Sequence, residues 1–191
     1  SKLKQGPQSS PLGRIWSLAA LMASSIIEQL KATSDEEKKQ ELWKSLSLAL
    51  LAGTQPAQED LISLADVKHL CTLQSDQSAS SSIRLVQLLA ELCRRKDLYS
   101  TEAIRVIMSK IESVDNNTTK EAIIAACICF PVALDYIRQN PREDESRTLL
   151  QEITELKAII VREVDSSYLS IKLAALRFVQ VVIVSYSMPN H

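Results

Sequence analysis

The stretch SIKLAALRFVQVVIVSYS, residues 170–187, is almost entirely apolar but contains Lys172, Arg177 and Gln180. A helix that spans a membrane takes about 20 apolar residues, and an arginine near its centre is costly in hydrocarbon. The apolar run from Leu173 to Tyr186 is shorter than that. We therefore expect no direct contact with a membrane and expect this segment to pack inside a protein.

If this stretch is helical, several of its polar residues lie on one side of the helix. At about 100° per residue, one narrow stripe collects the polar residues Ser170, Arg177, Gln180 and Ser185. Apolar residues cover most of the remaining surface of the helix. The pattern predicts a helix that is buried on nearly every side and has one polar edge, as in the inner layer of a layered helical protein.

The composition favours an all-α protein. The chain has 191 residues, of which 46% are hydrophobic and only 4% are aromatic, and it contains three glycines. β-Sandwiches and barrels need aromatic and β-branched alternation with frequent glycine turns. The formal net charge of -1 argues against nucleic-acid binding, which needs a surplus of cations to neutralise phosphates.

Helix signals follow one another along the chain with short breaks. Capping boxes are predicted at Ser34–Glu37 and Thr118–Glu121, Gly53 ends one helix, and the serine-rich segment 75–82 is predicted to be a loop. Pro131 lies inside a predicted helix and should kink it. The eight predicted helices begin near residues 15, 35, 56, 79, 100, 118, 145 and 167.

The spacing of these helices predicts a repeat. Alternate helices begin about 40–45 residues apart, which is the period of a HEAT or armadillo array. We expect an α-α superhelix of about four helix pairs over residues 13–188, preceded by a flexible segment, residues 1–12. A non-repetitive helical bundle is the alternative. The chain does not begin with Met, and we expect it to be a fragment of a larger protein.

Residues that could carry chemistry are few. His69 and Cys71 are two residues apart and would point to opposite faces of a helix, as would Cys127 and Cys129. The four cysteines are expected to be reduced and mostly buried. No phosphate-binding loop or nucleophile motif occurs. We predict no metal, no cofactor and no enzymatic activity.

Arg177 has two interpretations. It could close an ion pair inside the array, or it could be held on the inner, concave surface to contact a partner. Together with Gln180 and Ser170 of the polar stripe, and with Lys172 of the same helix, Arg177 forms the predicted partner-binding set.

Three segments, in this order, resemble the N-terminal HEAT domain of the symplekin family. DSSYLSIKLAALRFVQVVIVSYS (165–187) has the family's acidic turn, its small residues at Ala174–Ala175 and its cation before an aromatic at Arg177–Phe178. TTKEAIIAACICFPVALDYI (118–137) resembles the preceding inner helix, and SIRLVQLLAELCRRKDLY (82–99) is similar to an earlier repeat. Residues 1–80 show no such resemblance.

The resemblance implies a non-catalytic, nuclear scaffold of the machinery that cleaves and polyadenylates pre-mRNA. In that family this domain binds, and can stimulate, the phosphatase of the RNA polymerase II C-terminal repeat. It also implies other cleavage and polyadenylation subunits as partners. Arg177 matches the family's basic residue on the face used for the phosphatase. A helical-repeat RNA-binding module, or another nuclear or cytoplasmic adaptor, is the alternative.

Overall fold

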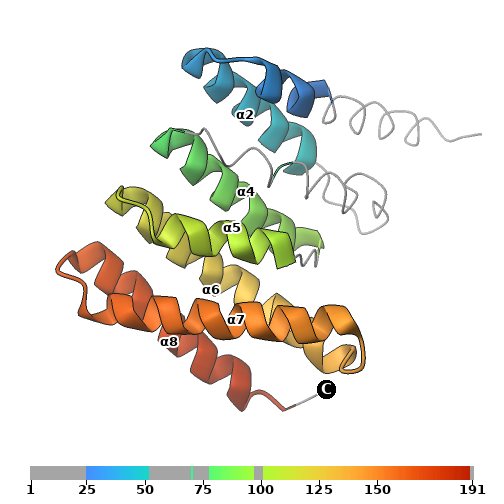
Figure 1. Ribbon diagram of the computed structural model, residues 1–191, viewed down its shortest axis with the longest axis vertical. Coiled ribbons are helices and arrows are strands. Elements are labelled where there is room, and N and C mark those ends of the chain that lie inside the picture. The colour runs from blue at the N-terminus through green and yellow to red at the C-terminus, as the bar shows by residue number, and fades with distance from the viewer. Residues whose placement is uncertain (1–24, 52–69, 71–77, 97–100, 190–191) are drawn as a thin grey trace, which may run out of the picture. The chain divides into compact units, whose positions relative to one another are not determined.

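The computed structural model describes residues 25–51, 70, 78–96 and 101–189 (Figure 1). All regular structure in these ranges is helical, which confirms the all-α prediction. The chain divides into two compact units, Ser1–Asp66 and Val67–His191. The predicted flexible segment 1–12 and most of the predicted third helix lie outside the described residues, so the number of helix pairs stays a prediction.

The first unit contains a helix over residues 25–32 and α2, Glu36–Leu51. Trp43 and Leu46 of α2 are fully buried. The carboxylate of Asp35 accepts the backbone N–H of Glu37 at 3.1 Å. The predicted capping box at Ser34–Glu37 is therefore wrong by one position, because the carboxylate of Asp35 takes the capping role given to Ser34.

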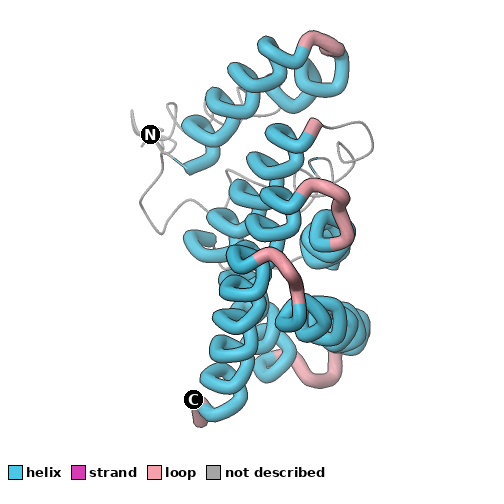
Figure 2. The backbone as a smooth tube through the Cα atoms, turned by 90° about the vertical axis from the view of Figure 1, so that its left-hand side faces the viewer, coloured by secondary structure: helices cyan, strands magenta, loops and turns pink. Residues whose placement is uncertain are grey.

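From residue 78 on, the described part of the second unit forms five helices and one short 3₁₀ turn. These are α4 (Ala79–Lys96), α5 (Thr101–Ile111), α6 (Asn116–Gln139), α7 (Asp144–Arg162), the turn Glu163–Asp165 and α8 (Leu169–Ser187). Helices α4, α6 and α8 pack in sequence as one layer, and α5 packs on α7 in a second layer (Figures 1 and 2). Alternate helices thus share a layer, as a helical repeat requires, and the helical-repeat prediction is confirmed.

Helix α6 is the centre of the core. Its buried face carries Ala122, Ala125, Ala126 and Ala133, small residues that let α4 and α8 approach closely on either side. Phe130 of α6 meets Phe178 of α8 edge to face, with ring centroids 5.6 Å apart. Both rings are fully buried. The α6–α8 contact therefore rests on an aromatic pair between two inner helices.

Polar contacts join α5 and α7, the two helices of the second layer, which we call the outer layer. Arg105 of α5 donates from Nε to Oε1 of Glu152 on α7 at 2.7 Å. The Thr101 hydroxyl donates to Glu145 at 2.7 Å. Glu152 is buried, so this pair satisfies a carboxylate that would otherwise be costly to place between the helices.

The starts of α6 and α4 bear on two further predictions from the sequence. Asp115, not Thr118, caps α6, because its carboxylate accepts both the backbone N–H of Thr118 at 2.8 Å and its hydroxyl at 2.7 Å. These bonds lower the pKa of Asp115. Helix α4 begins at Ala79, which confirms the helix start predicted near residue 79, whereas the predicted loop 75–82 is wrong over its last four residues. Ser78 accepts the N–H of Ser81 at 3.3 Å, because serine suits a helix cap as well as a loop.

Helix α8 is far more exposed than its sequence predicts. Only Ile171, Ala174, Ala175 and Phe178 are buried, and no described element covers the opposite side. That side exposes apolar residues, including Leu169, Leu173, Leu176, Ile183 and Val184. The prediction of burial on nearly every side is wrong, because α8 packs on α6 and α7 from one direction only.

Measured by length and composition alone, α8 is long and apolar enough to cross a membrane, contrary to the length argument from the sequence. Its buried side packs against the core, where Phe178 meets Phe130. The absence of direct membrane contact stays a prediction.

Replacing Phe178 with Ala should lower the free energy of unfolding by about 3–5 kcal/mol, because the change removes a fully buried ring and leaves a cavity. Urea unfolding followed by circular dichroism measures this. Leu173→Ala on the exposed side of the same helix is the control and should change stability by no more than about 0.5 kcal/mol. Equal stability of the two variants would show that the helix is rotated from its described orientation.

Candidate protein-binding groove

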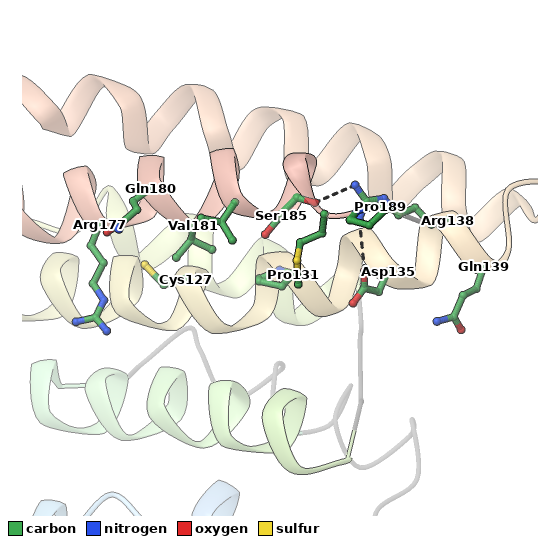
Figure 3. Close-up of a pocket in the computed structure, with 12 residues that line it drawn as sticks. Cys127, Pro131, Asp135, Arg138, Gln139, Arg177, Gln180, Val181, Ser185 and Pro189 are labelled. Atoms are coloured by element: carbon green, nitrogen blue, oxygen red, sulfur yellow. Dashed lines mark hydrogen bonds and ion pairs between the residues drawn. The ribbon is translucent and has the colours of Figure 1, made fainter. Parts of the chain in front are cut away.

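A groove of about 790 Å³ lies between α6 and α8 (Figure 3). It is lined by apolar and polar side chains of both helices and of the two residues after α8: Cys127, Pro131, Asp135, Arg138, Gln139, Arg177, Gln180, Val181, Val184, Ser185, Met188 and Pro189. We call these residues the α6–α8 groove. All of them belong to the second unit.

Helical spacing explains why these residues share one surface. Cys127, Pro131 and Asp135 lie four residues apart on α6, and Arg177, Val181 and Val184 lie four and three apart on α8. Side chains at such spacings form a stripe along one side of a helix. Two stripes from neighbouring helices therefore make the walls of one groove.

Arg177 is an exposed cation without an ionic partner in the described ranges. Its side chain extends from α8 across α6, beside Cys127 (Figure 3). No carboxylate among the described residues forms an ion pair with it, so the interpretation of Arg177 as an internal ion-pair residue finds no support there. Its guanidinium remains able to form hydrogen bonds to a group outside this part of the chain.

In contrast to that of Arg177, the guanidinium of Arg138 is held by contacts within the second unit. It donates to the backbone carbonyl of Ser185 at 2.9 Å, and it lies 3.7 Å from the carboxylate of Asp135. Ser185 lies in the last turn of α8, whose carbonyl groups lack intrahelical donors. Arg138 therefore joins the end of α8 to α6 and closes one end of the groove (Figure 3).

The thiol of Cys127 is half-buried in the groove. Burial raises its pKa to about 11, while the positive charge of Arg177 acts to lower it. At neutral pH the thiol is therefore protonated and is a poor nucleophile. Cys93 and Cys129 are buried deeper, and the pKa of Cys129 is raised further by its hydrogen bond with Cys93 and by burial.

The four residues predicted from sequence to bind a partner are not all in the groove. Arg177 and Gln180 line it, and both are exposed. Ser170 is exposed but lies two turns before Arg177, outside the groove lining. Lys172 is half-buried and points about 140° away from Arg177 around the helix.

Sequence reasoning missed the contribution of α6 to the site. The four-residue spacing of Cys127, Pro131 and Asp135 was a visible signal, but it does not reveal which neighbouring helix faces that stripe. The groove offers hydrogen-bonding groups, one unpaired cation and an apolar lining. Among the described residues no group of three or more His, Cys, Asp or Glu could hold a metal ion, and both histidines lie outside those ranges.

Residues 115–191 match the family model described as Symplekin/PTA1 N-terminal. The matched range contains all of α6, α7 and α8, and with them the whole groove. This match supports the symplekin-family assignment expected from residues 118–137 and 165–187. The resembling segment 82–99 lies outside the match. No similar sequence was found among curated proteins.

Alkylation of Cys127 tests the geometry of the groove. Its rate should be low at pH 8 and rise toward pH 10, because the pKa of the thiol is about 11. Arg177→Ala should slow the reaction at each pH, since the cation stabilises the thiolate. Mass spectrometry of the iodoacetamide-treated chain resolves Cys127 from Cys129.

Arg147→Ala on α7 is the control, because this arginine is exposed and pairs only with Asp144 in its own helix among the ion pairs of the described residues. If both variants react at the wild-type rate, Arg177 does not lie beside Cys127.

Proposed function

We propose that the chain is a member of the symplekin family, whose N-terminal model residues 115–191 match, and that its α6–α8 groove docks the phosphatase of the RNA polymerase II C-terminal repeat. The family supports a scaffold role in mRNA 3′-end processing. Within that role, the domain would hold the phosphatase and stimulate it without contributing catalytic groups.

The observation that carries the proposal is the state of Arg177. The residue is exposed, has no ion-pair partner among the described residues, and lines the same groove as the apolar side chains of Val181 and Val184. Arginine next to apolar surface is a frequent source of binding energy at protein interfaces, because it combines hydrogen bonds with burial of its stem.

The helical layers supply a rigid support for this residue. The aromatic pair of Phe130 and Phe178 fixes α8 on α6, and Arg138 fixes its C-terminal end. A surface held in this way loses little conformational entropy when a partner binds. Exposed apolar residues on α8, such as Leu173 and Leu176, extend the surface that a folded partner would cover.

The same premise supports a nuclear location and contacts with other cleavage and polyadenylation subunits. We propose these for the whole protein rather than for the groove. The exposed parts of Ser170 and Lys172 would then contribute to a wider contact surface on α8.

RNA binding is less well supported than protein binding. The formal charge of the chain is -1, and the groove contains Asp135 together with its two arginines. One of those arginines, Arg138, is already bonded to Ser185 and paired with Asp135. A site that follows an RNA backbone would need cations on several successive inner helices.

Calorimetric titration with the phosphatase from the same organism tests the proposal. Arg177→Ala should weaken binding by about 1–4 kcal/mol, as expected for an interface arginine. Its melting temperature should equal that of the wild type, because Arg177 is exposed and has no ionic partner among the described residues.

Arg147→Ala, which removes an exposed arginine from α7, should bind as the wild type does. Absence of binding by the folded wild type would exclude this phosphatase as the partner. An equal loss in both variants would show that binding depends on net charge and not on the groove.

A further inference from the structure

We infer that the α6–α8 groove receives an extended segment of its protein partner, with a carboxylate side chain on Arg177 and a backbone N–H on the carbonyl of Cys127. This rests on the proposed function, because it describes how a protein partner would enter the same groove. It adds the chemistry of the entering segment, which comes from three features of the lining.

The first feature is the carbonyl group of Cys127. Residue 131 is proline, which has no N–H, so the Cys127 carbonyl lacks the donor four residues later that an α-helix normally provides. Both residues line the groove, which places this carbonyl on the groove side of α6. A backbone acceptor without a partner is costly once water is removed, and a docking segment must supply a donor to it.

The second feature is the balance of charge. Arg177 is the groove cation that forms no ion pair in the described ranges, whereas Arg138 is paired with Asp135. One unpaired guanidinium matches a monoanion, and two parallel hydrogen bonds to a carboxylate suit its fork geometry. A phosphate dianion would retain excess negative charge beside this single guanidinium. The charge therefore favours Asp or Glu over a phosphorylated residue.

The third feature is the form of the segment. The interior of a helix has no free N–H to donate, because its amides are bonded within the helix. An extended segment leaves its N–H groups available and points alternate side chains to opposite sides. Val181, Val184 and Pro131 give the groove apolar contacts for the side chain two residues from the acid, which points to the same side as the acid. The volume of about 790 Å³ suits a few residues.

The probe for the test is the blocked peptide acetyl-Leu-Ala-Asp-N-methylamide, in which Leu and Asp point to the same side when the peptide is extended. It is titrated into the ¹⁵N-labelled full chain and followed by NMR. We expect saturable shifts of the Arg177 Nε–H and Gln180 side-chain amide signals, and none at Arg147. The Asn analogue of the peptide should produce at least tenfold weaker binding, because it lacks the charge. Shifts at Arg147 equal to those at Arg177, or equal binding of the Asn analogue, would overturn the carboxylate assignment. So would tighter binding of the phosphoserine analogue.

Pro131→Ala tests the role of the Cys127 carbonyl. The new N–H at residue 131 would bond this carbonyl inside α6 and remove it as an acceptor for the peptide. We expect roughly fivefold weaker binding, which corresponds to one net hydrogen bond of about 1 kcal/mol. The melting temperature should not fall, because alanine is a better helix residue than proline.

Pro141→Ala is the matched control, since this exposed proline lies in the turn after α6 and its replacement leaves residue 131 without an N–H. Binding of the Pro131 variant at the strength of this control would overturn the proposed hydrogen bond.

The phosphatase titration separates this inference from the proposed function. Peptide binding without phosphatase binding would leave the groove chemistry intact and exclude the phosphatase. Phosphatase binding that depends on Arg177 but not on Pro131, together with an inert peptide, would retain the proposed function and overturn the extended segment.

Discussion

The close packing of α6 against its neighbours in the inner layer determines the rest of the second unit. Four buried alanines allow α4 and α8 to approach α6, and the edge-to-face contact of Phe130 with Phe178 fixes the position of α8. Because both rings are fully buried, α8 cannot rotate without losing this contact. Because the face of α8 that carries Phe178 is turned toward α6, the residues on its other faces remain exposed. Arg177 immediately precedes Phe178 in the chain, and the 100° rotation between successive helical residues places it on the exposed side.

The same constraint explains why an apolar segment contains two cations. Helix α8 is buried from one direction, so its remaining circumference must tolerate water or a partner. Arg177 lies at the border between the buried face and the exposed face, where its stem can cover apolar surface and its guanidinium can stay hydrated. Lys172 is half-buried on another side of the helix. The two cations therefore serve different surfaces, although they are five residues apart.

The fold was predictable from sequence to a larger extent than the site. The 3.6-residue periodicity and the spacing of helices indicate an all-α repeat, and the end of α6 before Asn140 follows from Asn140–Pro141. Capping positions were less predictable, since Asp35 and Asp115 stand next to residues that could cap equally well. The exposure of α8 was not predictable, because hydrophobicity alone does not tell whether an element covers both sides of a helix. The pattern of α8 alone could predict Arg177 and Gln180 as site residues. Cys127 and Pro131 could be added only once it was known that α6 lies beside α8.

The most direct test of the central claim, that the α6–α8 groove is a protein-binding surface, is site-specific photocrosslinking. A photoreactive amino acid at position 180 would lie in the groove, and one at position 151 would lie on an exposed site of α7 in the other layer. Both positions carry glutamine, so the two substitutions are matched. After irradiation with the phosphatase, we expect a covalent adduct from position 180 and none from position 151. An adduct from position 151 alone would contradict the account, because it would place the partner on the outer layer instead of the groove.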